Sequence, residues 1–225
     1  MSTSSELIPG RFLFRMAYAC RYLKNIPADD RERLLDLTDS CRIDNFAGAD
    51  GRRNYADFRL AWNEFGLAVQ VEVKGKEQEP QGHGGRVRAS DGLILWVDTR
   101  DARASHRASR YCHQFHFLPT GGGPNADEPL LSQTKINRAL QDAPLCNPSE
   151  VPFRSHRIKG GYILEAFLPA AVLHGFDPEQ NRRLGFYYLV RDSELGDQVL
   201  SVSAEFPYAE DPSLWSVLEL TEDKK

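Results

Sequence analysis

Apolar and polar residues alternate along much of this chain. In GLAVQVEVK (66–74) every second residue is apolar, and the same period of two runs through RFLFRMAY (11–18) and DFRLAWN (57–63). A period of two places successive side chains on opposite faces of a strand, so these segments predict half-buried strands of an antiparallel sheet. The short NEFG (63–66) between two of them predicts a hairpin loop in which Gly66 takes a positive φ.

Other segments extend this pattern. GLILWVDT (92–99) is apolar on both faces, which predicts a central strand covered on both sides, with RYCHQFHFLP (110–119) as its neighbour. Gly160-Gly161 between two extended runs predicts a second hairpin. Three more strands are predicted in RLGFYYLVRD (183–192), QVLSVSAEF (198–206) and LWSVLEL (214–220).

Few helices are predicted: a short one in ADDRERLLDL (28–37) and one turn after Pro169. The whole chain, residues 1–225, therefore predicts a single all-β domain. We expect an antiparallel β-sandwich, immunoglobulin-like or jelly-roll-like, with long loops and one or two short helices. Two Gly- and Pro-rich stretches, 74–90 and 118–133, are predicted to be long loops, which in a sandwich often carry the binding residues.

Composition excludes some partners. A formal net charge of -4 and a pI of about 5.9 give no reason to expect nucleic acid or an anionic membrane as a partner. No apolar run approaches the roughly 20 residues that span a bilayer, and Arg11, Arg15 and Arg21 interrupt any signal-peptide core. We therefore expect a cytoplasmic location, or an extracytoplasmic one if a leader has been removed. The four cysteines lack metal-site spacing and are expected to be reduced thiols.

The histidines raise the question of a metal or catalytic site. His113 and His116 would share one face of a helix, but on the predicted strand they point to opposite faces, so the sequence does not predict a shared zinc ion. We expect one to be hydrogen-bonded inside the sandwich and the other to lie at its surface or in a groove. His106, with Asp98 and His113, forms a hypothetical hydrolase site, although no Gly-x-Ser-x-Gly nucleophile motif accompanies it.

Carboxylates at strand ends suggest a second kind of site. Asp98, Asp101 and Asp192 follow predicted strands, and clustered loop oxygens are the ligands that Ca²⁺ prefers. A structural calcium ion is therefore one interpretation, and ordinary turn formation is the other. No cofactor is expected to be required.

A saccharide site needs aromatic faces and polar side chains. Trp96 and Tyr208 could offer stacking faces, and Asp98 and Arg100 could bind hydroxyl groups, unless these two merely pair across the strand end. The candidate ligand-binding residues are Trp96, Asp98, Arg100, His106, His113 and Tyr208.

The order of several motifs then becomes informative. Five motifs follow one another along the chain: ADFRLAWNEFGLAVQVEV, SDGLILWVDTRD, GYILEAFLPAAVLHGF, RLGFYYLVRDSE and DPSLWSVLEL. Their order resembles that of the family 9 carbohydrate-binding modules and the wider DOMON-like superfamily over about residues 55–220. The resemblance implies an antiparallel β-sandwich that holds sugar between two aromatic side chains, in many members with structural calcium.

The chain departs from that pattern in places. The aromatic residue before the closing strand corresponds at best to Phe206 or Tyr208, and Met1 and Met16 are the only methionines, which does not fit the haem ligation of some DOMON-like relatives. We therefore expect a divergent, non-catalytic carbohydrate-binding module with a saccharide ligand. A structural or protein-interaction domain with a protein partner is the alternative, and the hydrolase is the third choice.

Overall fold

The computed structural model describes residues 16–27, 33–45, 53–102, 104–202 and 204–222. These residues form an all-β fold, as predicted. The strands are β1 (Ala17–Tyr22), β2 (Ala56–Asn63), β3 (Gly66–Lys74), β4 (Gly92–Asp98), β5 (Cys112–Gly122), β6 (Glu128–Thr134), β7 (Phe153–Ile158), β8 (Gly161–Pro169), β9 (Arg183–Asp192), β10 (Gly196–Val199) and β11 (Ser216–Thr221).

The helical turns in the described residues are all short 3-10 turns: η2 (Asp39–Cys41), η4 (Gly84–Ala89), η5 (Pro148–Glu150), η6 (Ala170–Val172) and η7 (Pro212–Leu214). None of these helices is long and apolar enough to cross a membrane. The turn predicted after Pro169 is η6, which confirms that prediction.

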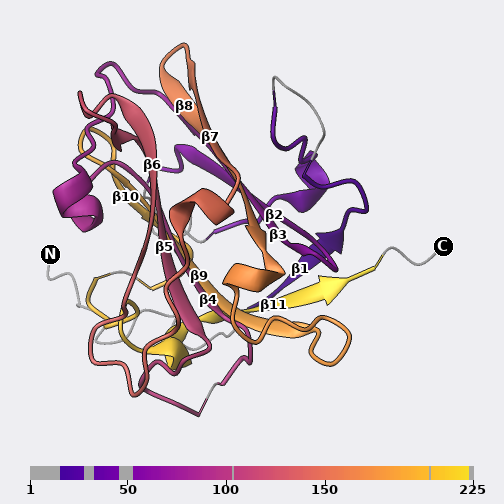
Figure 1. Cartoon of the computed structure of the whole chain (residues 1–225). Helices are drawn as coiled ribbons and strands as arrows, with labels where there is room; N and C mark the ends of the chain where they lie inside the picture. Colours follow the sequence, from indigo (N-terminus) through magenta and orange to yellow (C-terminus); the bar gives the residue numbers. More distant parts are fainter. Residues whose placement is uncertain (1–15, 28–32, 46–52, 103, 203, 223–225) are drawn as a thin grey trace, which may run out of the picture.

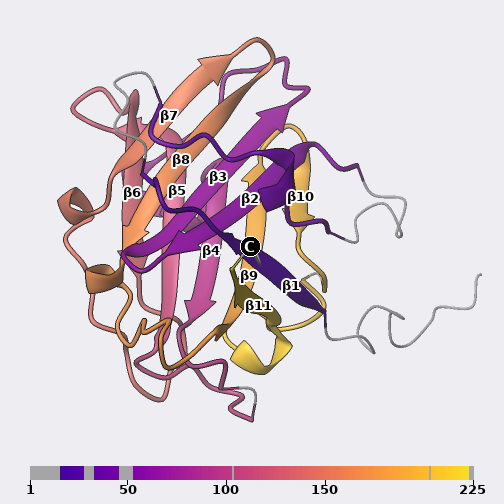
Figure 2. The same ribbon diagram turned by 90° about the vertical axis from the view of Figure 1, so that its right-hand side faces the viewer.

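The strands belong to one mixed sheet with the order β6-β5-β4-β9-β11-β1-β2-β3-β8-β7, and β10 adds to β9. The sheet curls so that its two halves face each other, as Figures 1 and 2 show. The edge strands β6 and β7 also contact each other, which makes the sheet a nearly closed barrel. Phe117 of β5 and Phe153 of β7 pack 5.6 Å apart between ring centroids where the halves meet.

The prediction of a wholly antiparallel sandwich of two sheets is wrong in one respect. β1 pairs in parallel with both β11 and β2, and this strand joins the two halves into one sheet. Alternation along a strand indicates which face is buried and not the direction of a neighbouring strand, so the sequence pattern could not show the parallel pairing of β1.

Two local predictions also need correction. The stretch 118–133 is a hairpin and not a long loop, because β5 continues to Gly122 and β6 begins at Glu128. Residues 33–37 are not helical, whereas 28–32, and most of the strand predicted at 11–18, lie outside the described residues. The β2–β3 hairpin is confirmed, with Gly66 at φ +154°.

Buried side chains lie in three layers. The interior between the two halves contains Leu95, Phe115 and Tyr188, among others. Leu35 and its neighbours in 33–37 cover the outer face of β2, β3 and β8, where they contact Phe167. Residues 33–37 pack there without helical structure, although a helix was predicted for them. The segment after β10 covers the outer face of β4 and β9, so both faces of β4 are buried, as predicted.

Candidate functional site

The aromatic residues predicted to stack on sugar are covered. Trp96 is 2% exposed and Tyr208 7% exposed, and both lie in the layer outside β4 and β9. Their rings meet edge to face at 5.7 Å, and Tyr208 also stacks on Tyr187 at 4.5 Å. The Trp96 indole N–H is buried without a hydrogen-bond partner in the described residues. These rings therefore present no free face to a pyranose in this structure.

Asp98 and Arg100 shape the loop after β4. The Asp98 carboxylate accepts hydrogen bonds from the backbone N–H groups of Arg100, at 3.0 Å, and Ala102, at 2.7 Å. Burial raises the pKa of Asp98, while these two donors oppose the increase. The Arg100 guanidinium lies 5.2 Å from the centre of the Tyr111 ring. Asp98 and Arg100 are thus linked by a side-chain-to-backbone hydrogen bond, and both Asp98 carboxylate oxygens accept hydrogen bonds within the loop.

The two strand histidines point to opposite faces, as predicted. His113 lies inside the barrel, where Gln133 donates to its Nδ1 at 3.2 Å and its Nε2 lies 3.4 Å from the His174 carbonyl. His116 lies on the outer face, where Thr134 is 2.9 Å from its Nε2 and its Nδ1 has no partner in the described residues. His116 is fully buried, so its expected place at the surface is wrong. Burial lowers the pKa of each imidazole to about 4.

The proposed hydrolase residues do not form a relay. His106 is on the exposed side of its loop, and its Nδ1 lies 3.0 Å from both Asp211 Oδ2 and Ser213 Oγ. A catalytic triad needs the carboxylate on one ring nitrogen and the nucleophile on the other, so this arrangement does not activate Ser213. Asp98, His106 and His113 each have different partners.

The three carboxylates considered for calcium do not meet at one point. Asp98 pairs with Gly185 at the start of β9, whereas Asp192 ends that strand, so they lie at opposite ends of the barrel wall. Asp101 lies near Asp98 and is 3.6 Å from the Arg183 guanidinium. The described residues contain no group of three or more His, Cys, Asp or Glu side chains placed to bind a metal ion.

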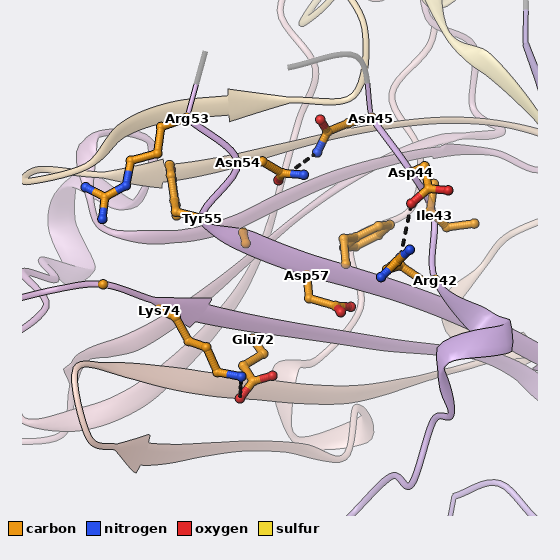
Figure 3. Close-up of a pocket in the computed structure, with 13 residues that line it drawn as sticks. Arg42, Ile43, Asp44, Asn45, Arg53, Asn54, Tyr55, Asp57, Glu72 and Lys74 are labelled. Carbon is orange, nitrogen blue, oxygen red and sulfur yellow. Dashed lines mark hydrogen bonds and ion pairs between the residues drawn. The ribbon is translucent and has the colours of Figure 1, made fainter. Parts of the chain in front are cut away.

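The structure instead shows a polar hollow on the outer face of β2 and β3. Its volume is about 510 Å³. Figure 3 shows Arg42 and Asp44 on one side, Lys74 and Glu72 on the other, and Asp57 between them. A smaller hollow of about 230 Å³ is also lined by Asp57 and Glu72. We call the two together the β2–β3 trough; its polar lining is Arg33, Asp36, Arg42, Asp44, Asn45, Arg53, Asn54, Asp57, Arg59, Gln70, Glu72 and Lys74.

Sheet geometry sets the centre of this trough. Asp57 of β2 is directly opposite Glu72 of β3, and Arg59 is opposite Gln70. Like charges in opposite positions destabilise a sheet, but here each has a cationic neighbour: Arg59 is 2.8 Å from Asp57, and Lys74 is 2.9 Å from Glu72. The Gln70 side-chain oxygen is buried and has no partner in the described residues. The trough therefore offers closely spaced donors and acceptors with nearly balanced charge.

None of the trough residues was among those predicted from sequence. Alternation places Asp57, Arg59, Gln70 and Glu72 on a polar face, but a polar face is ordinarily a flat solvated surface. The hollow exists because residues 42–45 run beside β2, with the Ile43 N–H donating to the Phe58 carbonyl at 2.9 Å. That long-range contact leaves no signal in the local pattern.

Solved structures share this fold. The chain aligns with a family 9 carbohydrate-binding module from Caldicellulosiruptor kristjanssonii in complex with glucose (TM-score 0.62, 14% identity, 93% of this chain and 98% of that one). The cellotriose complex of a family 9 module from the same organism gives a TM-score of 0.58 at 14% identity, over 93% of this chain and 96% of that one. A putative carbohydrate-binding protein from Bacteroides uniformis ATCC 8492 gives 0.53 at 11% identity, over 92% and 100%.

No protein-family model and no curated protein matches the chain. The chain has the fold of the family 9 carbohydrate-binding modules, at a sequence identity that marks it as divergent. The resemblance stated from the motifs is confirmed at the level of fold.

Proposed function

We propose that this chain is a non-catalytic module that binds a small neutral saccharide in the β2–β3 trough. The observation that carries the proposal is the trough itself, a concave polar surface in which Asp57 and Glu72 lie beside Arg59 and Lys74. Sugar hydroxyl groups both donate and accept hydrogen bonds, so a surface of alternating carboxylates and cations satisfies both roles.

Charge and size favour the same class of ligand. Because cations and anions line the trough in nearly equal numbers, an ionic ligand would meet repulsion as well as attraction, whereas a neutral polyol would not. The main hollow, at about 510 Å³, lies within the size range of small-ligand sites. The aromatic side chains that line the trough, Tyr55 and Phe58, are buried, at 7% and 1% exposed. We therefore expect binding by hydrogen bonds alone, with a Kd of about 1 mM.

The similar structures support the choice of saccharide, since two of them are complexes with glucose and cellotriose. The alternative function, a structural or protein-interaction domain, makes no use of the trough and predicts that neither sugar binds. A hydrolase would need an assembled relay, and the described partners of Asp98, His106 and His113 do not provide one.

The test is a titration with glucose and cellotriose up to about 20 mM, followed by amide chemical shifts in NMR spectra. We expect shifts along β2 and β3, and a loss of affinity of at least about fivefold in Asp57→Asn and Glu72→Gln, since each removes an acceptor. Asp197→Asn is the matched control, because Asp197 pairs with Arg191 across β9 and β10, outside the trough.

Three results are distinguishable. Binding that both trough variants weaken supports the proposal. Binding that they leave unchanged places the sugar elsewhere and overturns the site. No binding by the wild-type chain overturns the saccharide function in favour of a protein partner.

A further inference from the structure

A buried lysine lies among three carboxylates at the end of the barrel opposite the Asp98 loop. The Lys76 side chain is 2% exposed, and its ammonium is 2.6 and 2.7 Å from the two carboxylate oxygens of Asp192. It is also 3.5 Å from Asp91 and 3.6 Å from Glu194. Asp192 is fully buried and Glu194 is 18% exposed. We call these four residues the Lys76 cage.

Backbone donors hold the carboxylates of the cage in place. Each carboxylate accepts hydrogen bonds from two backbone N–H groups: Asp91 from Gln81 and Ser193, Asp192 from Glu194 and Leu195, and Glu194 from Glu77 and Gln78. The distances are 2.7–3.0 Å. Such bonds stabilise ionised carboxylates, so the cage is built to hold positive charge.

The cage joins parts of the chain that are far apart in sequence. Lys76 follows β3, Asp91 precedes β4, and Asp192 and Glu194 come from the end of β9 and the turn into β10. The backbone N–H of Lys76 also donates to the Gly160 carbonyl in the β7–β8 turn at 3.0 Å. Tying several loops to one central cation is the task that a structural metal ion performs in other proteins.

The cage has more negative charge than the ammonium neutralises. One cation faces three carboxylates, so their formal sum is about -2, whereas a divalent ion in the same place would leave about -1. The Tyr162 hydroxyl is buried without a partner in the described residues, and burial together with the nearby Asp192 and Asp91 raises its pKa. The Tyr162 hydroxyl therefore lies within electrostatic range of two cage carboxylates.

We propose that the Lys76 ammonium is the resident cation of this site, and that removing it turns the same carboxylates into a calcium site. The family resemblance implies structural calcium, yet Asp98, Asp101 and Asp192 do not meet, and Asp192 instead binds Lys76. Among the described residues, no three His, Cys, Asp or Glu side chains are placed to bind a metal ion, and the Lys76 ammonium lies 2.6–3.6 Å from the cage carboxylates. Calcium bonds of roughly 2.3–2.6 Å would require Asp91 and Glu194 to move inward by about 1 Å.

The experiment compares thermal unfolding of the wild-type chain and Lys76→Ala, each with EDTA and with about 10 mM CaCl₂. The wild-type Tm should be the same in both buffers. Without calcium, the variant should lose roughly 10 °C, because removing one partner leaves buried charges unpaired. Calcium should restore about 3–10 °C, as expected for a site with a Kd of about 0.1–1 mM. Terbium luminescence should show one ion per variant chain.

Two further variants make the result specific. Lys74→Ala removes an exposed ammonium two residues away and should respond to neither buffer. Lys76→Gln keeps the length of the side chain without its charge, and provides a second, less disruptive variant if Lys76→Ala does not fold. Adding Asp192→Asn to either Lys76 variant should abolish the calcium response. A wild-type Tm that rises with calcium, or two Lys76 variants that calcium does not stabilise, would overturn the proposal.

Discussion

The two buried histidines should make stability fall steeply in mild acid. The unfolded chain protonates histidine near pH 6.5, whereas the pKa of His113 and of His116 in the folded state is about 4. A lowered folded-state pKa means that the unfolded state binds more protons between these values. The stabilising contribution is therefore complete above about pH 6.5 and is lost as the pH falls toward 4.

The magnitude follows from the size of the pKa shift. Each pKa unit corresponds to about 1.4 kcal/mol, so pH 5, about 1.5 units below the unfolded value, costs roughly 2 kcal/mol for each histidine. Together they should lower the free energy of unfolding by roughly 4 kcal/mol, a large part of a typical 5–15 kcal/mol. The raised pKa of Asp98, which burial causes, acts in the opposite direction.

The assay is urea unfolding at pH 7.5 and at pH 5.0, with amide or aromatic signals read at equilibrium. His113→Gln and His116→Gln should each show about half of the wild-type pH effect, because one titrating group is gone. His106→Gln is the control for replacing a histidine as such, since the His106 side chain is 79% exposed. A wild-type difference below about 1 kcal/mol, or glutamine variants with the wild-type pH dependence, would refute the reasoning.

Two predictions concern packing. Phe115→Ala should lower the free energy of unfolding by about 3–5 kcal/mol in urea titrations, because its ring is fully buried. Phe65→Ala is the control: its side chain is 64% exposed, so the free energy of unfolding should change by less than about 0.5 kcal/mol. Equal effects of the two substitutions would contradict the burial argument. Gly161→Ala should lower the free energy of unfolding by about 1–3 kcal/mol, since the new methyl group would lie 1.8 Å from the Val73 carbonyl oxygen. Gly85→Ala is the control, because the space around Gly85 is open, and it should leave the free energy of unfolding in urea unchanged. A Gly161→Ala variant as stable as the wild-type chain would show that the β3–β8 pairing is looser than described.

Much of the barrel wall could be predicted from local patterns. The strands β2 and β3 were predicted from the alternation of apolar residues, β4 from a run that is apolar on both faces, and β8 and β9 from further extended runs. The β2–β3 hairpin was predicted from NEFG. The opposite orientation of His113 and His116 also followed from a period of two. These properties are encoded by neighbours along one strand, and so a single sequence is enough to read them.

The candidate sites depended on contacts between distant segments. Trp96 has an aromatic ring of the kind that stacks on sugars, but the segment after β10 covers it. Only the tertiary structure shows that the face of the ring is covered. The β2–β3 trough needs residues 42–45 beside β2, and the Lys76 cage needs Asp91 and Asp192 brought to one ammonium. The sequence determined which residues alternate between inside and outside. Only the tertiary structure decided which polar groups meet, because that depends on strand order and loop packing, neither of which has a local periodic signal.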